Sequence, residues 1–188
     1  MDAARIADGR RRRPDDSDFG GAGDGELADG VARSLASRWV QSAHPVAALL
    51  TALLVGAAFA TWLAEVSIRD SRLWVDYHQA TTAAYTAGVP PLGALALIAT
   101  AAALAVTWRS QSRRWLVLGA LGCLLAGLLV TVAVHFPMNA EIATWQPTSP
   151  PPNWEELRER WVMAHAVRSG LTVAALALVA AAGVRRSP

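Results

Sequence analysis

The sequence predicts an all-α membrane protein, a bundle of four transmembrane helices with an additional short helix on the extracytoplasmic side. Hydrophobic residues make up 53% of the 188 positions and charged residues only 17%, which is too apolar for an ordinary soluble domain of this length. Four uncharged or nearly uncharged segments each approach the roughly 20 residues that a helix needs to cross about 30 Å of hydrocarbon. Their long Ala and Leu runs lack the alternation typical of strands.

Four segments are predicted to span the membrane, at about residues 46–66, 90–108, 115–136 and 162–184. The second opens at Pro90 and Pro91, where the missing amide donors do no harm to a helix start. The fourth helix is expected to begin earlier than its apolar part, near Trp154, because Asn153 is a good N-cap and acidic residues follow it.

The N-terminal segment has a different composition. Residues 1–37 hold Asp, Gly, Ala and Arg with hardly an aromatic, so they are predicted to be a disordered tail, and residues 38–188 to be the transmembrane domain. The first apolar run begins only at Val46, which is too late for a secretory signal peptide.

Arginine placement predicts the orientation. All seventeen basic residues are Arg, a usage typical of GC-rich, actinobacterial genomes, and we therefore expect the bacterial plasma (inner) membrane as the location. Seven arginines flank the spans on one side and four on the other, which favours a multi-pass topology with cytoplasmic N- and C-termini. The net charge of +2 gives no reason to expect a nucleic-acid partner.

Polar residues converge on the outer end of the predicted bundle. Glu65 closes the first span, His135 and Asn139 close the third, and His165 and Arg168 lie one to two turns inside the fourth. A helix over residues 71–85 adds a face made of Trp74, His78, Thr81 and Tyr85. An arginine at membrane depth should face the bundle and pair, so Arg168 is expected to pair with Glu65, unless it only snorkels to the interface.

The histidines allow two interpretations. Each alone is an ordinary hydrogen-bonded interfacial residue, whereas several in one layer beside a carboxylate indicate a functional pocket. Glu65, His78 and His165 are candidate ligands for iron, copper or zinc. No HxxH, HxxxH or ExxH pair places a histidine and a second ligand on one helix face, so the sequence leaves the cofactor open.

Three segments together resemble a known family. They are residues 75–79 after the first span, 135–141 after the third and 161–168 at the start of the fourth. With the Pro137–Asn139 turn and the His165–Arg168 pair, they are similar to the anthrone oxygenase-like membrane family, over roughly residues 45–184. That family consists of four-span proteins, a few of which oxidise anthrones to anthraquinones with molecular oxygen.

The resemblance implies a mechanism. A base removes the acidic proton of the anthrone methylene, and the resulting enolate reacts with molecular oxygen, directly or through a metal. His78 or His165 is the candidate base, since histidine's unperturbed pKa lies near working pH. Arg168 and Asn139 are candidates to stabilise the developing phenolate. An apolar slot would hold the flat aromatic, with these candidate walls: Trp74, Tyr77, Tyr85 and Trp161.

Two other classes of function stay open at this stage. A non-catalytic membrane protein could bind a lipid or quinone, or assist a partner protein, with the same polar residues. A transporter is less favoured because no inverted repeat is visible. Gly119, Gly122 and Ala126 would permit close helix packing within the chain or in a homo-oligomer.

Overall fold

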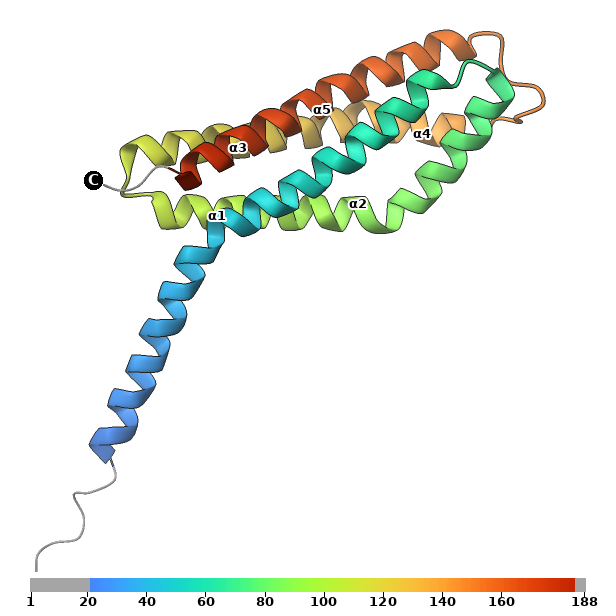
Figure 1. The fold of residues 1–188 in the computed structure, drawn as a ribbon. Coiled ribbons are helices and arrows are strands. Elements are labelled where there is room, and N and C mark those ends of the chain that lie inside the picture. Colours follow the sequence, from blue (N-terminus) through green and yellow to red (C-terminus); the bar gives the residue numbers. More distant parts are fainter. Residues whose placement is uncertain (1–20, 185–188) are drawn as a thin grey trace, which may run out of the picture. The chain divides into compact units, whose positions relative to one another are not determined.

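The computed structural model describes residues 21–184, and residues 1–20 and 185–188 lie outside the described part. Its contacts divide the chain into a unit Met1–Trp39 and a unit Val40–Pro188. The described elements, shown in Figure 1, are α1 (Gly21–Ser67), α2 (Ser71–Thr107), α3 (Gln111–Val130), the π-helical turn η1 (Thr131–His135), α4 (Phe136–Ile142) and α5 (Trp154–Val184).

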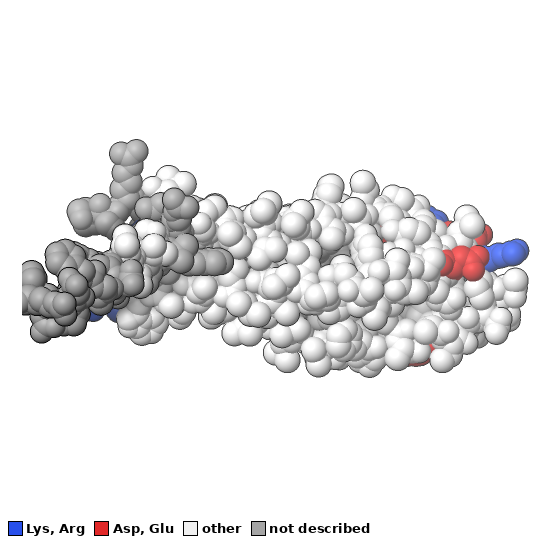
Figure 2. Space-filling model, turned by 90° about the horizontal axis from the view of Figure 1, so that it is seen from below, with Lys and Arg blue, Asp and Glu red and all other residues white. Residues whose placement is uncertain are grey.

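Four helical stretches are long and apolar enough to cross a membrane, namely Ser42–Ser67, Ser71–Thr107, Gln111–Ile142 and Trp154–Val184. Only 17–22% of the most apolar window of each is buried inside the protein, and large side chains such as Leu129 and Ile98 point outward. In Figure 2 charged atoms show at both ends of the bundle, most of them where α1 meets α2, and hardly any show in its middle. Helices that satisfy their own backbone groups and expose apolar side chains suit a lipid surrounding, which confirms the predicted four-helix membrane bundle.

Helix α2 differs from the prediction. Residues 71–85 were expected to form a separate outer helix before a span starting at Pro90, but one 37-residue helix runs through both. Asp70 caps it, because its carboxylate accepts a 3.0 Å hydrogen bond from the Leu73 amide. Pro90 and Pro91 lie inside the helix, where they remove two amide donors, and α2 changes direction along its length (Figure 1).

The start of α5 and the N-terminal segment can also be compared with the sequence. Helix α5 begins at Trp154 and carries Glu155 and Glu156 in its first turn, as predicted. The predicted disordered tail over residues 1–37 is different: residues 1–20 lie outside the described part, but the backbone is helical from Gly21 onward. Ala, Leu, Glu and Arg in this stretch favour a helix, whereas its four glycines, Gly21, Gly23, Gly25 and Gly30, oppose one.

The bundle has two cores of different character. Along α3 and α5 the buried residues are small or medium-sized, including Ala120, Ala175 and Val179, which allows the two helices to approach closely. At the α1–α2 end the core is aromatic, with Trp74 and Trp161 packed with Met138 and Ile142. The candidate site adjoins this aromatic core, because Trp161 belongs to both.

The close approach of α3 and α5 gives a testable prediction. A Cβ added at Gly119 would lie 3.2 Å from Leu178 Cδ1, whereas one added at Gly122 would meet nothing within 4 Å. We expect Gly119→Leu to destabilise the bundle by about 1–3 kcal/mol through overpacking, and Gly122→Leu to leave it unchanged, in thermal denaturation of the detergent-purified protein. Equal losses in both variants would contradict the packing, and a Gly122→Leu change in oligomer size would indicate a homo-oligomer contact.

Candidate active site

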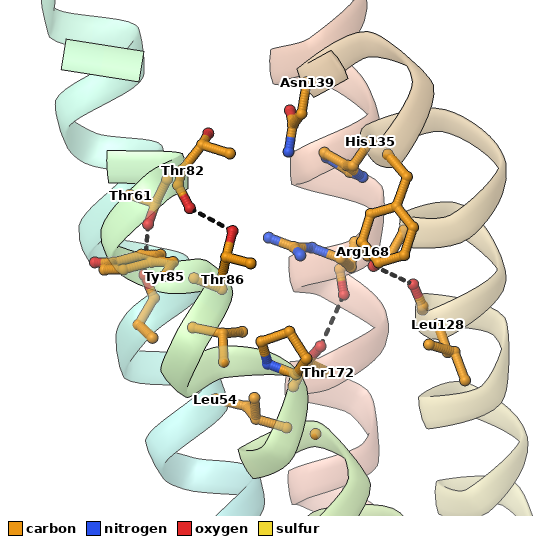
Figure 3. Close-up of a pocket in the computed structure, with 18 of the residues that line it drawn as sticks. Leu54, Thr61, Thr82, Tyr85, Thr86, Leu128, His135, Asn139, Arg168 and Thr172 are labelled. Atoms are coloured by element: carbon orange, nitrogen blue, oxygen red, sulfur yellow. Dashed lines mark hydrogen bonds between the residues drawn. The ribbon is translucent and has the colours of Figure 1, made fainter. Parts of the chain in front are cut away.

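A cavity of about 310 Å³ lies between the helices, beside the aromatic core. Helices α1 and α2 form one wall and α3, η1, α4 and α5 the other, as Figure 3 shows. Most of the lining is apolar, from residues such as Leu54, Leu97 and Leu128. The volume falls at the lower end of the range of about 300–1,000 Å³ for small-molecule sites.

Arg168 is the charged group that extends into this cavity (Figure 3). Its stem runs along Gly127, where a side chain on α3 would meet Arg168 Cγ at 3.7 Å. The Arg168 Nη2 donates to His165 Nδ1 at 2.8 Å, and His165 Nε2 in turn donates to the Ala58 carbonyl at 2.8 Å. Arginine is only a donor, so His165 is neutral, with its proton on Nε2. Both nitrogens of His165 are therefore engaged in orienting Arg168.

The expected ion pair between Arg168 and Glu65 is wrong. Among the described residues no carboxylate lies within ion-pair distance of Arg168. Glu65 is fully buried and satisfied elsewhere, because its Oε2 accepts from the Trp74 indole and its Oε1 lies 2.9 Å from His78 Nδ1. The positive charge of Arg168 thus faces the cavity without an ion-pair partner, although Glu65 also lines that cavity.

The end of α1 around Glu65 is held by α5 as well. The buried Arg158 Nη2 donates to the Glu65 carbonyl at 2.7 Å. That carbonyl belongs to the last turn of α1, where backbone acceptors have no partner within the helix and favour a cation. Glu65 therefore connects α1 to α2 through its side chain and to α5 through its backbone.

Asn139 links the same network to the cavity. Its Oδ1 accepts from the Trp161 indole at 2.8 Å and lies 3.2 Å from His78 Nε2. The indole only donates, which fixes the amide with its oxygen toward Trp161 and makes His78 Nε2 a donor. Among the described groups none accepts from Asn139 Nδ2, and Figure 3 shows its nitrogen toward the cavity. Both nitrogens of His78 are engaged, as are those of His165.

Several threonines also line the cavity, most of which were not among the residues singled out from the sequence. Their hydroxyls donate to carbonyls one turn earlier in their own helices, which leaves their methyl groups and oxygen lone pairs facing the space. These residues are Thr61, Thr86, Thr131 and Thr172. On the wall formed by α3, η1, α4 and α5, the donors available to a ligand are Arg168 and Asn139, and Tyr85 on α2 adds a hydroxyl from the opposite wall.

His135 was noted at the end of the third span but was given no role by the sequence. It lines the cavity in the π-helical turn η1, 2% exposed. Neither ring nitrogen has a hydrogen-bond partner among the described residues. The backbone of Val130, one π-turn earlier, approaches the ring without reaching hydrogen-bond geometry.

The predicted aromatic walls divide into two groups. Tyr85 and Trp161 line the cavity. Trp74 lies instead in the aromatic core, where its ring centroid is 6.2 Å from that of Trp154 and its indole binds Glu65. Tyr77 is not among the residues that line the cavity. A ligand in this cavity would therefore contact Tyr85 and Trp161. Trp74 would not contact it and instead holds the Glu65 carboxylate in place.

The family comparison agrees with this part of the chain. A model of the anthrone oxygenase family matches residues 79–178, more than half of the chain. The protein belongs to the anthrone oxygenase family. No curated protein and no solved structure matches it.

In this anthrone oxygenase family member, the matched region contains the α3–α5 wall of the cavity, with His135, Asn139 and Arg168. The match begins one residue after His78 and leaves Glu65 outside. The match also covers the α2 residues of the opposite wall from Thr81 onward, whereas the α1 residues of the cavity, including Glu65, lie outside it.

The proposed metal ligands do not converge. Glu65 and His78 are in contact, but both nitrogens of His165 are bound to Ala58 and Arg168. No group of three His, Cys, Asp or Glu side chains in the described part is arranged to hold a metal ion. Glu65, His78 and His165 therefore do not fit a shared metal site, because His165 has no nitrogen left to bind a metal.

Proposed function

We propose that this membrane protein binds a flat, largely apolar hydroxyaromatic ketone of the anthrone type in the cavity and oxidises its methylene carbon to a carbonyl with molecular oxygen. The observation that carries the proposal is Arg168, a cation without a carboxylate partner in a cavity whose lining is mostly apolar. Ionisable residues at membrane depth mark functional sites by default, and membership of the anthrone oxygenase family supports this chemistry.

The cavity suits such a substrate. The apolar lining from α1, α2 and α3 offers contact to the faces of an aromatic system, and Tyr85 and Trp161 add aromatic surface. Apolar substrates partition into the bilayer, so a cavity between membrane helices is reached from the phase in which they concentrate. The ketone oxygen is the group that Arg168 and Asn139 Nδ2 would bind.

Arg168 would act on the charge that forms during the reaction. Removal of a methylene proton leaves an electron pair that delocalises onto the ketone oxygen as an enolate. A guanidinium already held in position by His165, which is itself held by the Ala58 carbonyl, needs little reorganisation to stabilise that oxyanion. The low dielectric of the cavity strengthens the attraction.

The overall reaction balances without another reductant. The methylene carbon loses two hydrogens and gains one oxygen atom from O₂, and the other oxygen atom leaves as water. One O₂ is consumed for each quinone formed, and all four electrons come from the substrate methylene. Molecular oxygen is then the co-substrate, and the residues described here bind the substrate, remove the proton and stabilise the enolate.

We also propose the topology expected from the arginine distribution, with both termini cytoplasmic in a bacterial plasma membrane. Glu65, His78 and Asn139 would then lie toward the extracytoplasmic side. The alternative function is non-catalytic binding of a lipid or quinone in the same cavity, which its apolar lining would also support.

Oxygen consumption separates the two functions. We expect the protein in lipid nanodiscs to consume O₂ when a hydroxylated anthrone is added, with one anthraquinone formed for each O₂, above the rate of empty nanodiscs. Equal rates in the two samples, together with saturable binding of an anthraquinone, would reject the oxygenase and leave the binding function.

A further inference from the structure

We infer that His135 is the base that takes the methylene proton from the substrate. This inference rests on the proposed function, since it assigns one step of that reaction. A base must have a ring nitrogen free to accept a proton and must lie within reach of the substrate. His135 lines the same cavity as Arg168 and Asn139.

The other histidines are engaged or distant. His165 accepts from Arg168 with Nδ1 and donates to Ala58 with Nε2. His78 lies between Glu65 and Asn139, with both ring nitrogens in hydrogen bonds. His44 packs near Gly183 at the other end of the bundle, where a Cβ on that glycine would lie 3.5 Å from it.

His135 has the features of an unused acceptor. A buried imidazole with no partner at either nitrogen is uncommon, since the large majority of buried side-chain polar atoms are hydrogen-bonded. It also ends a π-helical turn, and such turns occur frequently at functional sites. Figure 3 shows its ring near the side chains of Asn139 and Arg168.

The ring of His135 packs edge-on against two other rings. The centroid of His135 lies 5.1 Å from that of Trp161 and 5.9 Å from that of His165, both close to edge-on. Both nitrogens are covered in the structure, although the residue lines the cavity. Turning the ring about its Cβ–Cγ bond would present a nitrogen to a bound substrate.

The step is a simple proton transfer. The methylene C–H bond breaks, the proton goes to a ring nitrogen of His135, and the electron pair stays with the substrate as an enolate. Its oxygen would lie against Arg168 and Asn139 Nδ2. His135 then takes the proton, and Arg168 and Asn139 stabilise the enolate that the same bond cleavage leaves. Molecular oxygen reacts only after this step.

Hydrogen exchange without oxygen tests this step by itself. The protein in nanodiscs is incubated anaerobically in D₂O with an anthrone, and deuterium at the methylene is measured by mass spectrometry. We expect the wild type to accelerate exchange and His135→Gln to lose about 10²-fold or more of that rate, while still binding an anthraquinone. His44→Gln, the matched control, should exchange like the wild type.

A second variant separates a chemical role from a structural one. Added imidazole should restore exchange in His135→Ala, since the free base can occupy the space of the missing ring. Exchange at the wild-type rate in His135→Gln, or loss of exchange in Glu65→Gln with His135→Gln unaffected, would overturn the assignment while leaving the oxidation intact. Failure of the wild type to oxidise the anthrone would overturn the proposed function itself.

Discussion

We expect Arg168→Gln to lower kcat for the proposed anthrone oxidation by about 10²–10³-fold, the loss typical of removing an oxyanion donor. The cation has no carboxylate partner among the described residues, so its full charge is available to the enolate. Glutamine keeps a donor of similar reach but removes the charge. The measurement is the rate of quinone absorbance increase under saturating substrate in nanodiscs.

Two further variants make the Arg168 result specific. Arg160→Gln changes an exposed arginine two turns earlier on the same helix and should leave kcat unchanged. Arg168→Lys keeps the charge but loses the planar geometry, so it should retain part of the activity. If Arg168→Gln turned over at the wild-type rate while binding substrate normally, Arg168 would have no role in the chemistry.

Glu65→Ala has the largest expected effect on stability, a loss of about 3–5 kcal/mol, as for removal of one partner from a buried charged pair. The carboxylate binds the Trp74 indole and His78, all three fully buried. Without it, two donors in the aromatic core lose their acceptor. We expect the midpoint of thermal unfolding to fall by on the order of 10 °C.

The control for Glu65 is Asp76→Ala, which removes an exposed carboxylate from the same end of α2. Exposed charges contribute little, so its midpoint should stay within about 1–2 °C of the wild type. Equal shifts in the two variants would show that the Glu65 network does not hold the helix ends together.

The spans could be predicted because the membrane imposes a length and a composition on each helix separately. The start of α5 at Trp154 followed from the capping and acidic residues beside it. The continuity of α2 did not follow, because Pro90 and Pro91 suit a helix start and also a bend within a helix. Only the packing of both arms against the bundle decides between these structures.

The sequence predicted that the polar residues of the candidate site lie together at one end of the bundle. It did not predict which of them bind one another. Arg168 was expected inside the bundle, yet the partner it has is His165, one turn earlier on its own helix. Glu65 was already satisfied by α2, through contacts that depend on how α2 docks. His135 received no role because a π-turn shifts the register that an α-helical reading assumes.

Oxygenation with ¹⁸O₂ tests most directly whether this protein oxidises an anthrone and whether Arg168 takes part. The purified protein in nanodiscs is supplied with an anthrone under ¹⁸O₂, and the quinone is analysed by mass spectrometry against empty nanodiscs and Arg168→Gln. We expect each new carbonyl to contain one ¹⁸O atom. The labelled quinone should form fast with the wild type and slowly in both controls. Labelled quinone at the same rate in all three samples would contradict this expectation.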